Sequence, residues 1–476
     1  MSQATSPAPA GFAPGTSFFF IGVAGAGMSA LAQYLAQRGY PVRGSDRQFG
    51  QIPAPISKTQ LEAEGIECVP QDGGGITSAT GFVITGSAIE NGNPDLDRAA
   101  ELGIPVLHRS ELLARLTRER RTIAISGTSG KSSVTGMTWH ILEFAGLSPS
   151  LLSGAGLSCL EAQGKIGNAV AGKGEWLVCE ADESDGTLVR YEPEVGVILN
   201  IDKDHKELSE LDELFRIFSA NTQGPLIVNG DHPLAVKFSK DRLWEFGHEG
   251  WQGFQGIDFE PVGTSIRFRL RRQGQLVRVE VPVPGRHNME NALAAIACAT
   301  AAGVPLKTSA EALKTWGGIH RRHQILGCVQ GVTLVDDFAH NPAKIAASIK
   351  ACQGFTKGRL LSWFQPHGFG PTRFLRKELV AEIQAALRPD DEIYFSRIFY
   401  AGGTAVQDIS AGDLIDDLKA LGCKAYYLPE RADAAKEMIR GAFPDDTILL
   451  MGARDPSLAE FARATLKQLH FAARCD

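Results

Sequence analysis

The residues with the clearest chemical meaning form a glycine-rich loop between an apolar run and a stretch with helical spacing. In such a loop, successive backbone N–H groups and the start of the following helix surround a polyphosphate, while a lysine neutralises its outer charge. A hydroxyl directly after the lysine is placed to bind Mg²⁺. The pattern predicts a phosphate-binding loop, and the alternative is a glycine-rich turn that binds nothing. The loop consists of Gly127, Thr128, Ser129, Gly130, Lys131, Ser132 and Ser133.

Acidic side chains follow the next apolar run, Trp176–Cys179. Glu180 ends that run, and a carboxylate at the carboxyl end of a buried strand beside a phosphate loop is placed to hold a metal directly or through water. We therefore predict Glu180 as a metal ligand. The carboxylates that follow are open to a second interpretation, a solvated turn. They are Asp182, Glu183 and Asp185.

The segment Asn200–His205 repeats this arrangement, because polar residues again follow a predicted strand, about twenty residues after Glu180. If the two strand ends lie side by side, His205 is a second candidate ligand for metal or phosphate. A structural or exposed histidine is the alternative.

A second glycine-rich segment lies near the amino terminus, at Gly22–Gly27, and Asp46 follows about twenty residues later. The spacing nearly fits the fingerprint of a dinucleotide-binding βα turn, in which the acidic residue binds a ribose hydroxyl. It predicts a nucleotide or a nucleotide-like diphosphate without saying which. A purely structural βα turn is the alternative.

Three later stretches combine arginine, histidine and asparagine in ways that a core does not require. Asn288 and Asn291 begin an alanine-rich helix, where Asn288 could simply be an N-cap. Two arginines lie at the start of the third α/β region of the chain, so one of them could contact a phosphate that is bound by the second region. The further candidates in these stretches are Arg321, Arg322, Asp336 and His340.

The elements that must position these residues alternate between short β-rich runs and amphipathic stretches, which is the pattern of α/β layers. Three cycles follow one another, with expected boundaries near residues 118 and 318. We predict a tail over 1–17 and three α/β domains over 18–117, 118–317 and 318–476. The expected strands include Phe18–Val23, Phe82–Thr85, Thr122–Ser126, Glu175–Glu180, Val195–Asn200, Thr333–Asp336, Arg359–Phe364 and Thr447–Met451.

Composition narrows the class of protein. The 476 residues are 43% hydrophobic and 21% charged, which excludes a disordered chain, a collagen-like repeat and a coiled coil. The net charge of −6 indicates no general polyanion-binding surface, so we expect no nucleic-acid partner. The apolar run Phe18–Ala26 is too short to span a membrane, and no basic start precedes it. The eight cysteines show no C-x-x-C spacing, so we expect a cytoplasmic protein without a structural zinc and without a membrane partner.

Taken together, these residues resemble the Mur ligase family, the ATP-dependent amide-forming enzymes of peptidoglycan precursor synthesis. The resemblance follows the family's order of motifs and covers nearly the whole chain after the tail. The motifs are Gly25-Ala-Gly27-Met28-Ser29, Gly44-Ser45-Asp46, Gly86-Ser87-Ala88-Ile89, Gly127–Ser132, Glu180–Asp185, His287-Asn288 with Asn291, and Phe364-Gln-Pro-His367.

The resemblance implies a three-domain α/β fold: an N-terminal Rossmann-like domain for the UDP-sugar, a central P-loop ATPase domain and a C-terminal Rossmann-like domain that brings the amino acid. For the UDP-sugar it implies contacts from Gly25, Ala26, Gly27, Met28, Ser29, Asp46, Ser87, Ala88 and Ile89. For ATP it implies Gly127–Ser133, with Asn288 and Asn291 near adenine, Arg321 or Arg322 near the phosphates, and Asp336 and His340 at the junction with the substrate. It implies one Mg²⁺ on Ser132 and Glu180 and a second on His205, so that Lys131, Glu180, His205 and His340 are the expected catalytic residues. His367 and Arg373 are the expected acceptor contacts.

Within the family, the first domain is most similar to the alanine-adding branch. This implies that L-alanine, or a similarly small amino acid, is joined to the lactyl carboxylate of UDP-N-acetylmuramate through an acyl phosphate, by a monomer or weak homodimer. Two departures put the amine in question. The family's usual arginines are replaced by Gly368 and Pro371, with Arg373 kept, and its Tyr-Gly-His-His run is here Phe338-Ala339-His340-Asn341.

Three other hypotheses remain open at this point. A recycling ligase of the same family would join a tripeptide to UDP-N-acetylmuramate. A nicotinamide-dependent dehydrogenase is indicated only by the first domain and leaves Lys131 and Glu180 unexplained. A non-catalytic nucleotide-binding regulator would follow if the altered acceptor residues mean lost activity.

Overall fold

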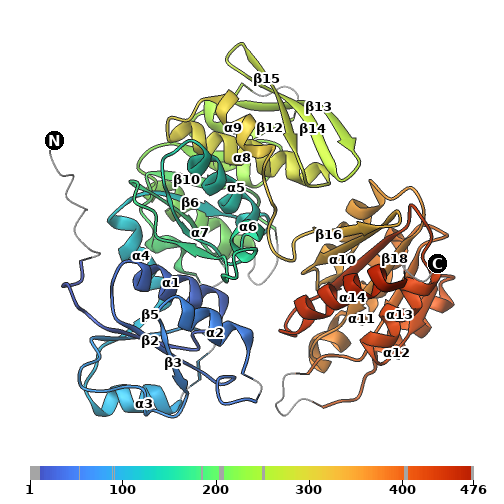
Figure 1. Ribbon diagram of the computed structural model, residues 1–476. Helices are drawn as coiled ribbons and strands as arrows, with labels where there is room; N and C mark the ends of the chain where they lie inside the picture. Colours follow the sequence, from blue (N-terminus) through green and yellow to red (C-terminus); the bar gives the residue numbers. More distant parts are fainter. Residues whose placement is uncertain are drawn as a thin grey trace. The chain divides into compact units, whose positions relative to one another are not determined.

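The computed structural model describes residues 11–52, 54–87, 89–90, 92–183, 186–202, 208–248, 252–400 and 406–472. Its strands form three separate sheets with helices packed on them, as the α/β pattern predicted (Figure 1). The chain divides into two compact units. The first comprises residues 1–259, 267–282 and 287–318, and the second comprises 260–266, 283–286 and 319–476.

The first sheet has five strands in the order β3-β2-β1-β4-β5, and all four pairs of neighbours are parallel. Its central strand β1 is fully buried because it reads Phe-Phe-Phe-Ile. The strands are β1 (Phe18–Ile21), β2 (Val42–Asp46), β3 (Glu67–Pro70), β4 (Phe82–Thr85) and β5 (Val106–His108); the helices are α1 (Ala26–Gln37), α2 (Ile56–Ala63), α3 (Pro94–Glu101) and α4 (Arg109–Arg118).

The second sheet has ten strands in the order β15-β14-β13-β12-β11-β10-β6-β9-β7-β8. The phosphate loop follows its inner strand β6, which pairs in parallel with β10 and β9. The strands are β6 (Arg121–Ser126), β7 (Ser150–Leu152), β8 (Ala169–Val170), β9 (Trp176–Glu180), β10 (Val195–Ile198), β11 (Leu226–Asn229), β12 (Glu245–Gly247), β13 (Phe254–Val262), β14 (Ser265–Arg272) and β15 (Gln275–Val281). The helices are α5 (Lys131–Phe144), α6 (Ser158–Glu161), α7 (Leu208–Asn221), α8 (Arg286–Ala301) and α9 (Leu306–Leu313), with 3-10 turns η1 (Thr187–Arg190), η2 (Ala235–Phe238) and η3 (Arg242–Trp244).

The third sheet has six strands in the order β16-β17-β21-β18-β19-β20, parallel except for the β16–β17 pair. The strands are β16 (Gln324–Val329), β17 (Val332–Asp337), β18 (Leu360–Gln365), β19 (Glu392–Phe395), β20 (Lys424–Tyr427) and β21 (Thr447–Gly452); the helices are α10 (Pro342–Gln353), α11 (Phe369–Ala386), α12 (Ala411–Ala420), α13 (Arg431–Gly441) and α14 (Leu458–Ala472).

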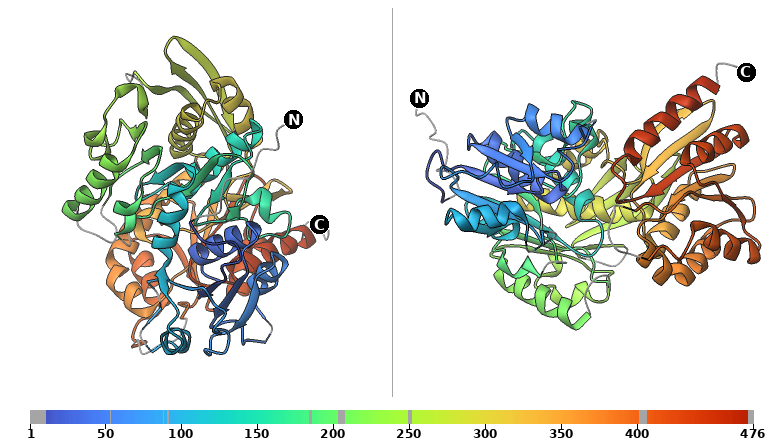
Figure 2. Two further views of the ribbon diagram at one scale, coloured as in Figure 1. Left: turned by 90° about the vertical axis from the view of Figure 1, so that its left-hand side faces the viewer. Right: turned by 90° about the horizontal axis from the view of Figure 1, so that it is seen from below.

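Both faces of the third sheet are covered by helices, because its inner strands are apolar on both sides. In β21, Leu449 and Met451 belong to the core under α10, α11 and α12, whereas Ile448 and Leu450 belong to the core under α13 and α14. The right view of Figure 2 shows helices on both sides of this sheet. Such a doubly covered parallel sheet leaves only its strand ends for polar groups.

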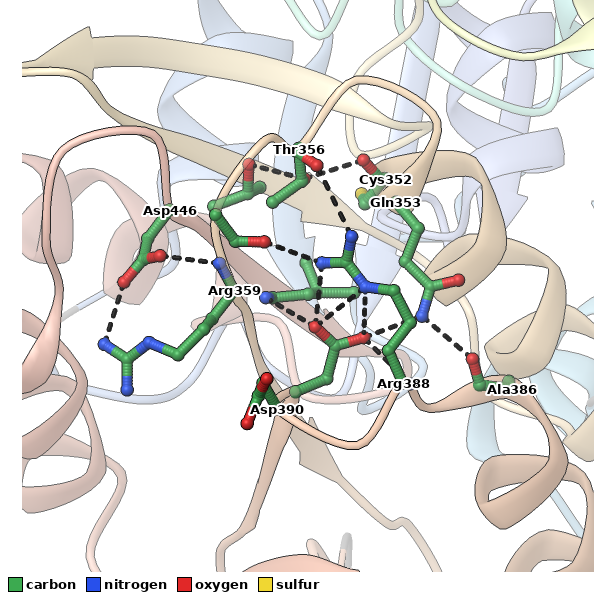
Figure 3. Close-up of polar contacts among 12 residues, drawn as sticks. Cys352, Gln353, Thr356, Arg359, Ala386, Arg388, Asp390 and Asp446 are labelled. Carbon is green, nitrogen blue, oxygen red and sulfur yellow. Dashed lines mark hydrogen bonds and ion pairs between the residues drawn. The ribbon is translucent and has the colours of Figure 1, made fainter.

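The amino ends of this sheet's strands are joined by a network of paired charges (Figure 3). Asp446, directly before β21, accepts hydrogen bonds from the backbone N–H of Arg359 at 2.6 Å and from its guanidinium at 2.8 Å. Asp391, directly before β19, accepts from Arg388 at 2.8 Å, from the Gln353 amide at 2.7 Å and from a backbone N–H of β18. Although burial alone would raise the pKa of Asp391, these hydrogen bonds lower it.

Within the described ranges, no helix combines the length and the apolar character needed to cross a bilayer.

Candidate active site

The phosphate loop is held in a conformation that requires glycine. Gly127 has a φ of +136° and Gly130, the residue before α5, a φ of +87°. A Cβ on Gly130 would lie 2.9 Å from Asn291 Oδ1, and one on Gly127 would lie 3.0 Å from the side chain of Leu199. The loop therefore packs closely against two other segments, one of which is α8 with Asn291. The contact of Asn291 with the nucleotide stays a prediction.

Asn200, which follows β10, fixes the shape of this loop. Its Oδ1 accepts hydrogen bonds from the Thr128 hydroxyl and the Ser129 N–H, both at 2.8 Å, and its Nδ2 donates to the Ser129 carbonyl at 3.0 Å. Our sequence analysis placed polar residues at this strand end but did not assign Asn200 a role. Its signal is a position directly after a strand that neighbours the phosphate loop.

Lys131 lies 2.8 Å from Glu183 Oε2 and 3.6 Å from Asp182 Oδ1, and its Nζ also donates to the Gly127 carbonyl at 2.7 Å. Its side chain is only 15% exposed. Burial would lower the pKa of Lys131, but the neighbouring carboxylates outweigh burial and raise it. Lys131 is therefore a positive charge held at the carboxyl edge of the second sheet. Glu183, for which a solvated turn was the alternative, is buried beside it.

Glu180 ends β9 at the same edge, since its register partner is Ile125 of β6, two residues before the loop. One carboxylate oxygen accepts hydrogen bonds from the Ser153 hydroxyl at 2.9 Å and from the Gly154 N–H at 2.6 Å. These two donors orient the carboxylate. His205, Ser184 and Asp185 lie outside the described residues.

The amino-terminal segment forms a turn and the start of α1. Asp46 ends β2, and its carboxylate accepts from the backbone N–H of Ala24 at 3.2 Å and of Gln48 at 3.1 Å. A Cβ on Gly27 would lie 2.9 Å from Arg109 Nη1, so a guanidinium covers the beginning of this helix. Arg109 was not among the predicted residues, because it comes from α4, far along the chain. Ala88 lies outside the described residues, and Ser87 contacts His108 at 3.2 Å.

Asn168, just before β8, connects this turn with the second sheet. Its Nδ2 donates to the Ala26 carbonyl at 2.9 Å and to the Ser29 hydroxyl at 3.0 Å, and its carbonyl accepts from the Ser153 N–H at 2.9 Å. Ser153 in turn donates to Glu180. A short chain of hydrogen bonds thus runs from the predicted UDP-sugar segment to the predicted metal ligand.

In the second compact unit, the candidates lie where β17, β21 and β18 end. The rings of His340 and His367 have centroids 5.7 Å apart. The pKa of His367 is lowered to about 4, first by burial and then by His340 and Arg454. Arg373, predicted to bind the acceptor, lies near the start of α11 and pairs with Asp408, so its contact with the acceptor stays a prediction.

The two predicted phosphate-binding arginines differ in their surroundings. Arg321 is buried; its guanidinium pairs with Asp336 at 3.1 Å and donates to the Gly452 carbonyl at 2.8 Å. Arg322 is exposed, with its guanidinium 4.9 Å from the Phe338 ring. Only Arg322 leaves its charge accessible to a ligand, so the contacts expected of Arg321 and Asp336 with ATP stay predictions.

Comparison with known proteins decides the family. Three family descriptions match consecutive parts of the chain: Mur ligase family, catalytic domain, over residues 17–121; Mur ligase middle domain over 125–299; and Mur ligase, glutamate ligase domain, over 321–454. The chain belongs to the Mur ligase family.

Named relatives of this Mur ligase span almost its whole length. UDP-N-acetylmuramate–L-alanine ligase of Syntrophomonas wolfei is 33% identical over 458 residues, covering 93% of this chain and 96% of the relative. The protein of the same name from Mesorhizobium japonicum is 33% identical over 468 residues, covering 94% and 97%.

Solved structures share the three-domain α/β fold. UDP-N-acetylmuramate-alanine ligase from Thermotoga maritima superposes with a TM-score of 0.80 at 24% identity, covering 96% of this chain and 99% of that one. A murein peptide ligase from Psychrobacter arcticus superposes with a TM-score of 0.66 at 21% identity, covering 96% and 99%. The predicted fold class is confirmed, and this Mur ligase is an ATP-dependent ligase.

One departure from the family pattern has a structural reason. Gly368 precedes α11 with a φ of +71° and a ψ of 128°, a combination that a residue with a side chain rarely adopts. A Cβ there would lie 3.3 Å from Pro371, the second departure. Gly368 and Pro371 therefore form one altered turn in this Mur ligase, and an arginine at 368 would strain it.

Proposed function

We propose that this Mur ligase joins L-alanine to the lactyl carboxylate of UDP-N-acetylmuramate, with ATP converted to ADP and phosphate. The observation that carries the proposal is the 33% identity, over more than nine-tenths of the chain, to proteins named for that reaction. The phosphate loop and the oriented Glu180 support it, because they offer the phosphate-binding N–H groups and the metal ligand that phosphoryl transfer from ATP requires.

The chemistry explains why phosphoryl transfer is needed. A carboxylate does not condense readily with an amine in water, because its oxygen is a poor leaving group. Transfer of the γ-phosphoryl group of ATP to the lactyl carboxylate gives an acyl phosphate. The neutral amine attacks the activated carbonyl, a tetrahedral intermediate forms, and phosphate departs. In the first step two anions must approach each other, so positive charge at the carboxyl edge of the second sheet lowers the barrier.

Lys131 supplies that charge. Glu183 and Asp182 hold its ammonium protonated and directed toward the loop. The backbone N–H groups of Gly127–Ser133 and the start of α5 surround the phosphates. Asn291 lies beside Gly130, which suits a role near the nucleotide, and Asn288 accepts from Asn291 at 3.0 Å.

The residues present fit a Mg²⁺ ion. Mg²⁺ keeps several waters and takes few protein ligands besides phosphate oxygens, and the Ser132 hydroxyl and the oriented Glu180 carboxylate are oxygen donors of the kind it prefers. The described residues hold no cluster of three His, Cys, Asp or Glu side chains for a metal, so the phosphates must complete the coordination. When bound, the ion would offset charge on the transferred phosphoryl group. A second ion on His205 stays a prediction.

The first domain is proposed to bind the UDP-sugar. The start of α1 and the Arg109 guanidinium over Gly27 offer the donors and the positive charge that a diphosphate requires. Asn168 links this segment to Ser153 and Glu180, so one network of hydrogen bonds joins the proposed sugar-nucleotide segment to the proposed metal ligand. The domain boundaries near 118 and 318, the monomer or weak homodimer, the absence of nucleic-acid and membrane partners and the cytoplasmic location stay predictions.

A second candidate function is ligation of a tripeptide to the same sugar nucleotide. The altered turn at Gly368 and Pro371 favours it, because it removes two cationic side chains and leaves room for a bulkier acceptor. The experiment is ADP release with UDP-N-acetylmuramate and a panel of L-alanine, L-serine, glycine and the tripeptide. We expect release with L-alanine. Release with the tripeptide alone would replace the main proposal, and the absence of any amine-dependent release would favour a non-catalytic regulator.

A further inference from the structure

Three neighbouring strands of the third sheet, β17, β21 and β18, have residues in register near their carboxyl ends. Three residues after these register partners, each strand is followed by a side chain that contains nitrogen. Asp337 of β17 and Phe364 of β18 both pair with Met451 of β21. His340, His367 and Arg454 each lie three residues past these register partners. Because the pairs are parallel, these three residues leave the sheet at the same edge, with Arg454 on the middle strand.

Arg454 combines a left-handed backbone with a side chain that is exposed and, among the described residues, unpaired. Its backbone has a φ of +53°, in the left-handed region that residues other than glycine seldom occupy, and its side chain is exposed. The part of the chain that the structure describes gives it no hydrogen bond or ion pair, whereas Arg321, Arg359, Arg376 and Arg388 are all paired with carboxylates. Strained backbone that is retained at a strand end indicates a functional constraint.

Two buried polar atoms at this edge also have no partner among the described residues, Gln365 Oε1 and His367 Nδ1. Gln365 is only 8% exposed and ends β18 in register with Gly452, two residues before Arg454. A buried carbonyl oxygen without a donor costs free energy unless a ligand supplies one. His367 is neutral at pH 7 because its pKa is about 4, so its unprotonated nitrogen also accepts a hydrogen bond.

The carboxyl edge of the third sheet therefore holds Arg454, a cation that is unpaired within the described residues. Beside it lie two hydrogen-bond acceptors without a donor among those residues, on Gln365 and His367. An α-amino acid carries the complementary pair, a carboxylate one carbon away from an amine. We propose that Arg454 binds the α-carboxylate of the acceptor amino acid, while Gln365 and His367 accept hydrogen bonds from its amine. This assignment rests on the proposed function. Arg454 would supply the positive charge for the acceptor's carboxylate that the turn at Gly368 and Pro371 lacks.

The charge around the site agrees with this assignment. Burial lowers the pKa of His340, and the cations Lys344, Arg322 and Arg454 lower it further. The edge is therefore positive around two neutral imidazoles. An anionic ligand is attracted there, and its amine meets acceptors that do not compete with it for a proton at neutral pH.

The test compares L-alanine with L-alaninamide, which keeps the amine and lacks the carboxylate. The variant is Arg454→Asn, because asparagine tolerates the left-handed backbone while removing the cation. The readout is kcat/KM for ADP release with each amine, together with KM for ATP and for UDP-N-acetylmuramate. Arg440→Gln is the matched control, an exposed arginine on α13.

We expect the wild-type enzyme to prefer L-alanine over L-alaninamide, and Arg454→Asn to reduce that preference about 10- to 100-fold, the range for a charge-assisted hydrogen bond. The loss should come from L-alanine alone, with KM for ATP and the sugar nucleotide unchanged. Arg454→Lys should retain part of the preference, and Arg440→Gln all of it. Arg454→Gly, which relaxes the backbone, should repeat the result if the asparagine variant folds poorly.

If wild type ligates L-alanine and Arg454→Asn keeps the full preference for it, the role of Arg454 is wrong while the proposed function stands. If wild type ligates a tripeptide and no free amino acid, the proposed function is wrong and this assignment falls with it.

Discussion

Buried polar groups at the amino ends and at the carboxyl ends of the strands in this Mur ligase differ in their hydrogen-bond partners. At the amino ends of the third sheet, Asp446 and Asp391 are buried and each accepts from several donors of its own chain. At the carboxyl ends, Gln365 Oε1 and His367 Nδ1 are buried without a partner among the described residues. The two aspartates at the amino ends have their partners within the chain, whereas the two atoms at the carboxyl ends are those to which we assign a ligand.

The second sheet shows the same difference. Arg121, the first residue of β6, pairs with Glu194 at 2.6 Å and with Glu175 at 3.5 Å, and these residues directly precede β10 and β9. At the opposite ends of the same strands lie the phosphate loop and Glu180. Ligands of open parallel sheets bind at the carboxyl ends of strands. We infer that the paired charges at these amino ends serve the fold, and we propose that Lys131, Glu180 and Arg454 at the carboxyl ends serve the chemistry. Arg321 and Asp336, also at the carboxyl ends of the third sheet, pair with each other.

The largest effect should come from removing a carboxylate at the amino ends of the third sheet. Asp446→Ala leaves the backbone N–H groups of Arg359 and Phe443 without their acceptor and removes one of the two carboxylates that hold the Arg359 guanidinium, and should lower the free energy of unfolding by about 3–5 kcal/mol. Denaturant unfolding measures this, and kcat at low temperature should stay within about twofold. The control is Asp390→Ala, which removes a fully exposed pair with Lys424 and should change stability little. A large fall in kcat with unchanged stability would contradict the division between the two ends.

Next in size is Lys131→Gln, at the carboxyl end of the second sheet. The glutamine can still donate to Gly127 or Glu183 but carries no charge, so kcat should fall about 10²- to 10³-fold. ADP release measures the loss, and circular dichroism checks the fold. Lys424→Gln, at the amino end of the third sheet, should leave kcat unchanged. Near-normal turnover of Lys131→Gln would refute the assignment of the phosphate loop.

A smaller effect is expected for Glu180→Gln. The amide keeps its hydrogen bonds with Ser153 or Gly154 in part but is a poorer Mg²⁺ ligand, so the Mg²⁺ concentration for half-maximal rate should rise about 10- to 100-fold. The measurement is a Mg²⁺ titration of the rate at saturating substrates. If the half-maximal concentration does not move, Glu180 orients other groups and binds no metal.

The smallest effect concerns pH. The pKa of His367 is about 4 in the folded chain, below its ordinary value of 6.5, so the unfolded chain binds a proton first. Stability should therefore be unaffected by this group above pH 6.5 and fall as the pH drops from about 6.5 to 4. In histidine-labelled protein, with His367→Asn to assign the signal, the His367 ring should titrate near pH 4. A midpoint near 6.5 would show that the ring is solvated and not part of a buried acceptor site.

The local parts of this fold were predictable from the sequence, and the long-range pairings were not. The phosphate loop, the strand ending at Glu180 and the strand β4 have apolar runs and glycine signals within a few residues. The pairing of Arg321 with Gly452 joins residues 131 positions apart, and nothing in the local pattern around Arg321 distinguishes it from Arg322. Local sequence patterns identify helices and strands. Contacts between side chains that are distant in sequence depend on the order and register of the strands in the sheet.

The same limit explains the residues that the sequence analysis missed. Asn200, Asn168 and Arg109 have no motif of their own, because each acts through its place beside a segment that is distant in sequence. Arg373 has a motif, and its exposed ion pair with Asp408 neither confirms nor contradicts the predicted acceptor contact. Arg454 becomes a candidate only when the register of β17, β21 and β18 is known.

The central claim, that the lactyl carboxylate is activated as an acyl phosphate and then joined to L-alanine, is tested most directly by following oxygen. UDP-N-acetylmuramate labelled with ¹⁸O in both carboxylate oxygens is incubated with ATP and L-alanine, and phosphate and product are analysed by mass spectrometry. We predict one ¹⁸O atom in the released phosphate and one in the new amide, because the oxygen that accepts the phosphoryl group leaves with it. Phosphate without the label would show that ATP is hydrolysed by water and would contradict the proposed function.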